Sequence, residues 1–285
     1  MRITFFASEG VPFSKTGGLA DVVGALPKAL ASGGHEVQVL LPRYRATKGG
    51  RPMPQLKSLT VPLPSGLKFA AILDGGEAAG VRTYLVDLPE FFDRDQLYME
   101  KGQDYPDNHL RFASFCLAGL EFLKRFGNPP EVIHCHDWQS ALVPVYLRNL
   151  YQTDSFFENC PVVFTIHNLG YQGLFPPHIL PEIGLHPRLF TMEGLEFYGK
   201  VNLLKGGIVC SDFITTVSRK YAEEIQTPGI RLRPGRGFEE PRRPPAGDCE
   251  WRGLRRLESC DGQAHTGELH GRGLKGERYL QEGSA

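Results

Sequence analysis

The chain has 285 residues, with 32 basic and 32 acidic side chains, so its formal net charge at pH 7 is zero. A neutral chain lacks the basic excess with which proteins bind nucleic acid or anionic membrane surfaces, and we expect neither partner. Hydrophobic residues make up 41% of the chain, which is enough for a packed core in one large domain or two smaller ones.

The sequence also favours a cytoplasmic location. The six cysteines are scattered, with no repeated Cys-x-x-Cys spacing, as expected where thiols stay reduced. Residue 1 leads directly into a predicted strand, which leaves no room for the apolar stretch of a secretory leader. No apolar run approaches the length that spans a membrane.

Predicted strands and helices alternate along most of the chain. Strands are predicted at residues 3–7, 36–41, 68–73, 82–86, 132–135, 162–166 and 213–217. Helical spacing of apolar residues covers 19–30, 108–126 and, interrupted by a proline at 144, 139–150. Pro27 should kink the first helix, and Gly33-Gly34 suits its C-terminal end. Such alternation predicts an α/β fold: a Rossmann-like, mostly parallel sheet with helices on both faces.

A lysine and two glycines stand where the first strand leads into the first helix. Gly17 and Gly18 let a ligand approach the backbone, because neither has a Cβ. The start of the helix directs N–H groups and a partial positive charge to the same point, and Lys15 adds a full charge. This combination predicts a site for a phosphate or diphosphate. The alternative is a tight turn beside a solvated lysine, since the order of residues matches neither a Walker A loop nor a Gly-x-Gly-x-x-Gly fingerprint.

A second polar group ends the strand at 132–135. The run from His134 to Asp137 contains residue types that bind zinc. Alternation along a strand, however, turns both histidines to the face opposite Cys135, and no second cluster has ligand spacing, so we expect no metal. Asp137 fits either a ligand cleft, as expected at the carboxyl end of a parallel strand, or the N-cap of a helix that begins near Gln139.

A third polar group follows the strand at 162–166. His167 and Asn168 precede glycines at 170 and 173, a composition that suits a loop around a ligand. From the residues alone, a histidine that only satisfies backbone groups is the more common case. The three polar groups all lie at predicted carboxyl ends of strands, where ligands bind to sheets of this kind.

Longer segments resemble the bacterial glycogen synthases and plant starch synthases of glycosyltransferase family 5. These segments are residues 8–22, 136–138, 164–173, 205–208 and 215–218, and the resemblance runs from residue 1 to about 227. It implies a retaining transfer of glucose from ADP-glucose to the nonreducing 4-hydroxyl of an α-1,4-glucan such as glycogen, with no metal or other cofactor. It also implies one half of a two-domain GT-B fold, with residues 1–228 as the first Rossmann-like domain.

The resemblance implies roles for single residues. In the family, the histidine matching His167 contacts the glucosyl unit being transferred, and Lys15 with the amides of the glycine pair contacts the nucleotide phosphates. Three further residues match positions that line the family's sugar-binding cleft: Asp137, Asp21 and Tyr98. Asn168 matches a residue that would orient hydroxyl groups beside His167. Lys205, with glycines at 206 and 207, resembles a loop that faces the cleft, although an ordinary helix start fits as well.

The composition changes at residue 229. Residues 229–285 hold ten Arg, one Lys and eleven Gly, without Val or Asn, whereas residues 1–228 hold eleven Arg and ten Lys. We expect this tail to be disordered, because it has few large apolar residues. An RNA-binding arm is an alternative, although the tail lacks regular aromatic interleaving.

A shift of reading frame offers a physical origin for the tail. Codons for residues 229–237 can be chosen so that starting one base later encodes Glu-Phe-Gly-Tyr-Gly-Leu-Glu-Gly, a continuation familiar in this family. The same offset in residues 247–259 permits an Asn-Gly-Val-Asp segment, which the family carries at its domain junction. We therefore expect an inserted base near codon 229.

The shifted frame implies a chain without the family's second domain, which supplies an arginine–lysine pair and a glutamate. We expect such a chain to bind ligand weakly and not to turn over. A single domain that binds a nucleotide sugar or glucan without catalysis is the alternative. An unrelated Rossmann-like kinase or dehydrogenase is a third possibility, but the chain lacks the loops that mark these enzymes.

Overall fold

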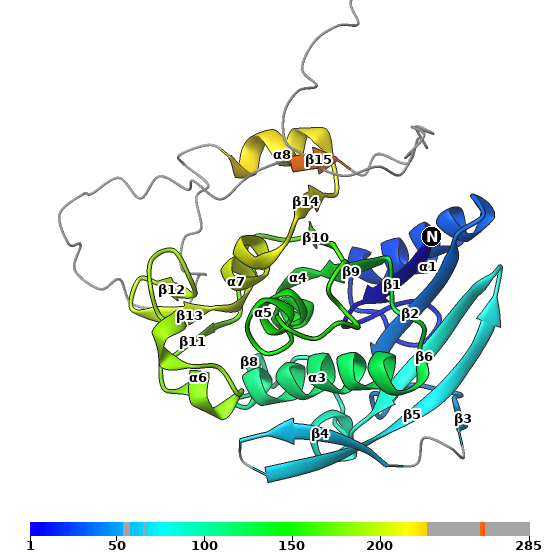
Figure 1. Cartoon of the computed structure of the whole chain (residues 1–285), viewed down its shortest axis with the longest axis horizontal. Helices are drawn as coiled ribbons and strands as arrows, with labels where there is room; N and C mark the ends of the chain where they lie inside the picture. The colour runs from blue at the N-terminus through cyan, green and yellow to red at the C-terminus, as the bar shows by residue number, and fades with distance from the viewer. Residues whose placement is uncertain (54–57, 65, 227–256, 260–285) are drawn as a thin grey trace, which may run out of the picture.

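A computed structural model describes residues 1–53, 58–64, 66–226 and 257–259 (Figure 1). A ten-stranded sheet lies at its centre, in the order β15-β14-β10-β9-β1-β2-β6-β5-β3, with β4 paired to β5. The parallel strands are β1 (Arg2–Phe6), β2 (Glu36–Pro42), β6 (Val81–Asp87), β9 (Val132–His136), β10 (Val162–Ile166), β14 (Phe213–Thr216) and β15 (Leu257–Ser259). The antiparallel strands β3 (Arg51–Pro52), β4 (Leu59–Leu63) and β5 (Gly66–Ala78) form one edge.

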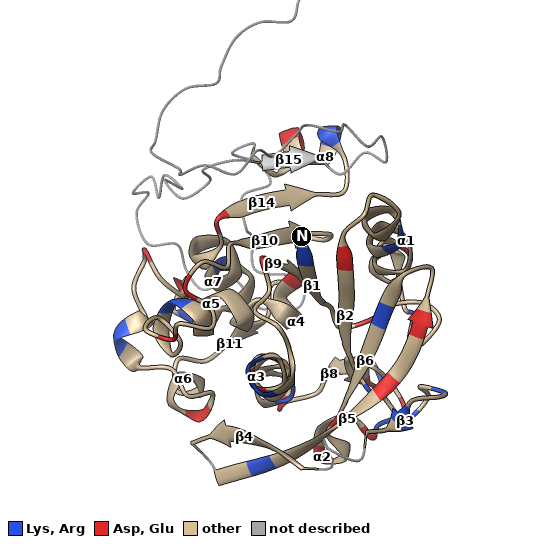
Figure 2. Cartoon of the chain, turned by 45° about the vertical axis from the view of Figure 1, so that its right-hand side comes forward, with Lys and Arg blue, Asp and Glu red and all other residues tan. Residues whose placement is uncertain are grey.

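Helices cover both faces of the sheet, as Figures 1 and 2 show. On one face lies α1 (Gly18–Ser32), and on the other lie α3 (Asn108–Phe126), α5 (Leu142–Asn149) and α7 (Leu203–Cys210). Each face has its own apolar core, because neighbouring residues of a strand point in opposite directions: Phe5 packs with the α1 side and Phe6 with the α3 side. The predicted fold class, a mostly parallel α/β sheet with helices on both faces, is confirmed.

The remaining elements are short. The helices are α2 (Pro89–Phe92), α4 (Asp137–Ser140), α6 (Ile179–Glu182), a 3₁₀ turn at Pro187–Leu189 and α8 (Arg219–Ile225). Two small sheets combine β11 (Leu174–Phe175), β13 (Lys200–Asn202) and β12 (Glu196–Phe197), and β7 (Met99–Glu100) with β8 (Gln103–Asp104).

Prolines act differently in two helices. The helix predicted over 139–150 is split between α4 and α5, and Pro144 lies in the first turn of α5, where the missing N–H leaves no hydrogen bond unmade. Pro27 lies inside α1, which continues as one element to Ser32. Gly34, just past the end of α1, has a φ of 85°, the left-handed conformation that favours glycine after a helix.

The order of the strands creates a switch point. The chain passes from β1 to β2 and onward to β6 on one side of β1, and then α3 carries it to β9 on the other side. Ligands bind to open parallel sheets at such a point, in the crevice beyond the carboxyl ends of the strands. The loops after β1, β9 and β10 begin there.

Most of residues 229–285, for which we predicted a disordered tail, lies outside the described residues. The exception is β15, at residues 257–259, which pairs in parallel with β14 and extends the sheet. At these three residues the structure differs from the predicted disorder.

Candidate functional site

The predicted anion site lies at an open helix start. Gly17 precedes α1 in an extended conformation, with no side chain capping the first turn. A Cβ placed on Gly17 or on Gly18 would meet no atom within 4 Å, so the backbone is open to an incoming group. The Nζ atom of Lys15 lies 2.6 Å from Oδ1 of Asp21, and both side chains are more than half exposed, at 51% and 58%. The structure therefore brings together the lysine, the glycine pair and Asp21 of the sequence analysis.

The buried carboxylate of Glu9 binds the backbone of this loop. Glu9 accepts hydrogen bonds from the backbone N–H of Thr16 and, at 3.0 Å, from the Thr16 hydroxyl. Burial raises the pKa of Glu9, while the hydrogen bonds from Thr16 and the Gly17 amide oppose that rise. Glu9 was not among the site residues predicted from the sequence. Its place inside the resembling segment 8–22 was the available signal.

Asp137 links the loops after β9 and β10. Its Oδ1 accepts the N–H of His167 at 2.7 Å and that of Asn168 at 3.5 Å. Because the carboxylate bonds to another loop, it does not cap a helix beginning near Gln139: α4 begins at Asp137 itself, with no side-chain cap. The N-cap alternative is thus not observed. The pKa of Asp137 is raised to about 7, mainly by burial and to a smaller extent by the nearby Glu9 carboxylate, while the hydrogen bonds from His167 and Asn168 oppose the rise.

The backbone at Asp137 is strained. Its φ is 55°, in the left-handed region that non-glycine residues seldom occupy. Such strain persists where the surrounding structure fixes the residue, often at functional sites. Here the two cross-loop hydrogen bonds hold the carboxylate.

His167 lies beside two buried histidines of β9. Its Nε2 is 2.9 Å from Nδ1 of His136, while Nε2 of His134 is 2.7 Å from Oγ1 of Thr165. Burial lowers the pKa of His167 to about 4, that of His134 to about 3, and that of His136 well below its ordinary value. All three imidazoles are therefore neutral near pH 7. The predicted alternation holds, because Cys135 faces the core on the opposite side.

Tyr98 and Asn168 complete the group of predicted residues. The Tyr98 hydroxyl is 2.7 Å from Oγ of Ser8, in the loop after β1, and burial raises the pKa of Tyr98 well above its ordinary value. Asn168 is exposed, and its Oδ1 accepts the N–H of Gly170 at 2.8 Å, which shapes the loop. Its amide nitrogen has no partner among the described residues and stays available to a ligand.

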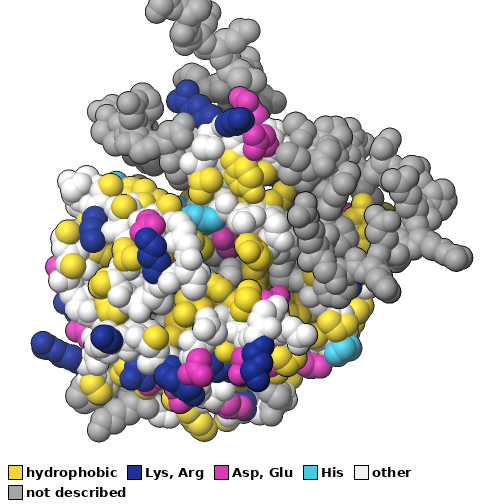
Figure 3. All heavy atoms as spheres, turned by 180° about the vertical axis from the view of Figure 1, so that it is seen from behind, with side chains coloured by type: hydrophobic (Ala, Val, Ile, Leu, Met, Phe, Trp, Pro, Cys, Tyr) yellow, Lys and Arg dark blue, Asp and Glu magenta, His cyan; other side chains and the backbone are white. Residues whose placement is uncertain are grey.

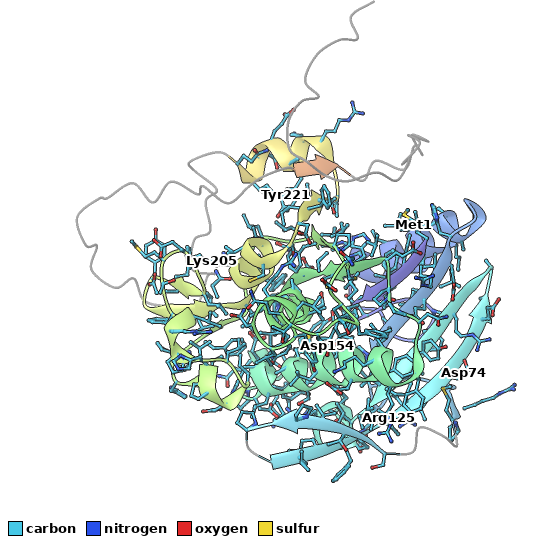
Figure 4. The ribbon with its side chains drawn as sticks, viewed as in Figure 1. Met1, Asp74, Arg125, Asp154, Lys205 and Tyr221 are labelled. Carbon is cyan, nitrogen blue, oxygen red and sulfur yellow. The ribbon has the colours of Figure 1, made fainter. Side chains whose placement is uncertain are left out.

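Lys205 stabilises the start of a helix, which was the alternative to a loop facing the cleft. It lies buried in the first turn of α7, where the Asn202 side chain caps the helix by accepting the Lys205 N–H at 2.9 Å. Its Nζ donates to the carbonyls of Met192 at 2.5 Å and Glu196 at 2.6 Å. Figure 4 shows Lys205 beside α7 and Tyr221 below α8. The Tyr221 hydroxyl accepts the N–H of Leu169 at 2.8 Å, so α8 holds the loop that carries His167.

These loops provide three chemical functions at one end of the sheet: open N–H groups with a lysine, a neutral imidazole, and a buried carboxyl group. Figure 3 shows a face on which histidine and acidic side chains reach the surface together, bordered by hydrophobic ones. No cluster of three or more His, Cys, Asp or Glu side chains arranged for a metal occurs within the described ranges. Among the helices that the structure describes, none is long and apolar enough to cross a membrane.

Two curated relatives and one solved structure similar to this chain are named as glycogen or starch synthases. A glycogen synthase of Koribacter versatilis is 57% identical over 227 residues, which cover 80% of this chain and 47% of the relative. A glycogen synthase of Geotalea uraniireducens is 48% identical over 229 residues, with coverage of 80% and 47%. The solved catalytic domain of starch synthase IV from Arabidopsis thaliana, bound to ADP and acarbose, is 33% identical with a TM-score of 0.71, and the match covers 80% of this chain and 47% of that one.

The chain thus spans about half the length of the curated relatives it matches. The sequence profile of the starch synthase catalytic domain matches residues 2–238, which is most of the chain and includes each site residue described above. The resemblance seen in the separate segments is therefore confirmed over a continuous region. The chain belongs to the family of starch synthase catalytic domains, glycosyltransferase family 5.

Proposed function

We propose that this chain forms one half of the active site of an ADP-glucose-dependent α-1,4-glucan synthase. The reaction would transfer glucose from ADP-glucose to the nonreducing 4-hydroxyl of a glycogen chain, with retention of anomeric configuration. The starch synthase IV structure that resembles this chain holds ADP and acarbose, a diphosphate nucleotide and a glucan analogue. Four free cysteines among the described residues support a cytoplasmic location.

One observation carries the proposal: the open start of α1 lies at the same end of the sheet as the buried Asp137 and the partly buried His167. The helix N-terminus and Lys15 would neutralise the negative charge that develops on a departing nucleoside diphosphate. Donors fixed in advance stabilise such charge best, because they need no reorganisation during the reaction. Cationic side chains can do this without a metal ion.

The second loop group would bind the sugar. His167 is neutral and Asp137 is held by two N–H groups, so both present polar atoms from rigid backbone positions. The exposed Asn168 amide adds a donor beside them. Polar groups held in this way suit sugar hydroxyls, which both donate and accept hydrogen bonds.

A chimera tests this proposal. Residues 1–226 would be joined to the second half of the Koribacter versatilis relative, and transfer of labelled glucose from ADP-glucose to glycogen would be measured. We expect transfer by the chimera and none by the 285-residue chain, because this chain spans about half the length of its relatives and its described residues leave Lys15 more than half exposed to water.

Two variants of the chimera sharpen the result. His167→Ala should lower turnover by at least about a hundredfold. His178→Ala should not change it, because the His178 side chain is 71% exposed. A chimera that folds but neither binds ADP nor transfers glucose would contradict the proposed function. Turnover by the 285-residue chain alone would show that it is complete for catalysis.

A further inference from the structure

The bond between His136 and His167 can be made in two ways. Both rings are neutral near pH 7, and a neutral imidazole has one N–H and one lone pair. Nδ1 of His136 and Nε2 of His167 are 2.9 Å apart, so one nitrogen must donate and the other accept. The choice decides which atom of His167 carries its proton.

The two arrangements differ at the far nitrogen of each ring. If His136 donates from Nδ1, its Nε2 is a bare lone pair, and the proton of His167 lies on Nδ1. If His167 donates from Nε2, the proton of His136 must lie on its own Nε2, and His167 Nδ1 is a bare acceptor. The surroundings of His136 Nε2 therefore select between them.

His136 Nε2 offers no place for a proton. It is enclosed and has no hydrogen-bond partner among the described residues. The rings of Phe5 and His134 stack nearly parallel to His136, at interplanar angles of 16° and 25°. An N–H lies in the plane of its own ring, so it would point at neither stacked face. For backbone groups, a buried N–H without a partner is rarer than an under-satisfied buried carbonyl, and we extend this preference to the ring nitrogen.

We propose that His136 is a positioning residue that holds His167 in the tautomer with its proton on Nδ1. That nitrogen has no partner among the described residues and, unlike His136 Nε2, is not enclosed by protein. His167 then presents a hydrogen-bond donor to the ligand site and does not act there as a base. The donor suits an oxygen of a sugar, a use that rests on the proposed function, whereas the position of the proton does not.

Nuclear magnetic resonance can locate the proton directly. Long-range ¹H–¹⁵N correlation spectra of the uniformly ¹⁵N-labelled 285-residue chain distinguish protonated from bare ring nitrogens. We expect His167 and His136 each to carry the proton on Nδ1 at pH 7. A His167 proton on Nε2 would overturn the inference, and this spectrum needs no variant that might fail to fold.

Two variants separate positioning from general packing. His136→Phe keeps a flat ring in the stack but removes the donor, so the Nδ1–H form of His167 should fall to less than half of the population. Thr165→Val removes the partner of His134, 2.7 Å away, and leaves the His136–His167 bond in place. We expect no change of the His167 tautomer in Thr165→Val. Retention of Nδ1–H in a folded His136→Phe protein would contradict the positioning role.

Titration with acarbose distinguishes this inference from the proposed function. If His167 donates to a sugar oxygen, acarbose should shift the resonance of its Nδ1 proton. If that proton is on Nδ1 but does not respond at any acarbose concentration, sugar binding by His167 is wrong while the tautomer stands. If the proton is on Nε2, the inference fails whether or not acarbose binds.

Discussion

At the scale of single residues, the Lys15–Asp21 ion pair is the contact that a bound phosphate would replace. Its atoms are 2.6 Å apart, and both side chains are more than half exposed. Exposed ion pairs contribute only about 0–1 kcal/mol to stability, so a ligand can break this one at little cost. Asp21 therefore competes with the ligand for the lysine.

We expect Lys15→Ala to weaken binding of ADP about tenfold, because a hydrogen bond to a charged group contributes roughly 1.5–3 kcal/mol. Asp21→Asn should strengthen it a few-fold by releasing the ammonium group. Lys28→Ala is the matched control, since it removes the same charge from an exposed position of α1. Calorimetric titration of the 285-residue chain with ADP measures all three. Equal losses in Lys15→Ala and Lys28→Ala would indicate a general charge effect and no specific contact.

Glu9 gives a prediction about the stability of the same loop. Glu9→Ala leaves the N–H and hydroxyl of Thr16 without their acceptor, so the free energy of unfolding should fall by about 1–3 kcal/mol. Glu9→Gln keeps one acceptor oxygen and should lose less. Urea unfolding compares the variants. If Glu9→Ala is as stable as the unmodified chain, the carboxylate does not hold the loop.

The position of a single residue follows from the sequence where a chemically active side chain stands at a strand end. Lys15 and Asp137 are of this kind, and the structure places both in loops that follow parallel strands, while their roles stay predictions. Glu9 and His136 were missed, because their roles depend on burial and on partners from other loops. No local pattern indicates that His136 Nδ1 meets a ring 31 residues away.

At the scale of elements, β9 and the loop after β10 together carry three neutral histidines that make the fold sensitive to acid. The folded pKa values of His134, His136 and His167 lie far below the ordinary 6.5, so the unfolded chain binds protons there first as the pH falls. Asp137 acts in the opposite direction, because its folded pKa of about 7 lies above the ordinary 3.8, and Glu9 acts like Asp137.

Three histidines against Asp137 and, in part, Glu9 give a net uptake of about one to two protons on unfolding near pH 5. The free energy of unfolding should therefore fall as the pH decreases from 6.5 towards 4, by at most about 3 kcal/mol per pH unit. Asp137→Asn removes the opposing group and should steepen this fall, while its amide oxygen can still accept the His167 N–H. Urea unfolding at several pH values tests both slopes. A flat profile from pH 6.5 to 4 would show that the histidines titrate as freely when folded as when unfolded.

Two glycines are expected to have different roles: Gly207 allows close packing, and Gly17 gives a ligand access to the backbone. A Cβ on Gly207 would lie 2.6 Å from Phe164 and 2.8 Å from Ala141, so Gly207→Ala should destabilise the fold by about 1–3 kcal/mol. Gly17→Ala should change stability by less than about 0.5 kcal/mol, because its Cβ meets nothing within 4 Å. It should nevertheless weaken ADP binding by obstructing the backbone. Thermal unfolding and ADP titration of both variants give the comparison, and tight ADP binding by Gly17→Ala would rule out close approach at this glycine.

The main parallel strands and the long helices could be predicted from the spacing of apolar residues, because buried elements show this spacing most strongly. The strand predicted over 68–73 is only the middle of β5, whose ends extend to Gly66 and Ala78. Two-residue strands such as β7 and β11 were not predicted, since so short a segment has no period. Their pairing depends on tertiary packing, as does the capping of α7 by Asn202.

At the scale of the whole molecule, the curated relatives match this chain over about half of their own length. The change of composition at residue 229 adds to that observation, because ten arginines and one lysine replace the earlier balance. We propose that a one-base insertion near codon 229 accounts for both.

Resequencing the gene across codons 220–285 from genomic DNA tests this. We expect the frame one base later to stay open and to encode Glu-Phe-Gly-Tyr-Gly-Leu-Glu-Gly, followed by Asn-Gly-Val-Asp near codon 250. If the extra base is absent from the new DNA sequence, the chain continues into a second domain. If it is present, the cell makes the chain as printed. A stop codon or unrelated text in the shifted frame would contradict the insertion.

The position of β1 has a consequence for synthesis on the ribosome. One edge of β1 pairs with β2, which follows about thirty residues later in the chain. The other edge of β1 pairs with β9, which begins only at Val132. At about 5–20 residues per second, that edge stays open for on the order of ten seconds after β1 emerges. The loop that carries Lys15 is therefore made long before the loops that carry Asp137 and His167, and the site forms only as the last parallel strands join the sheet.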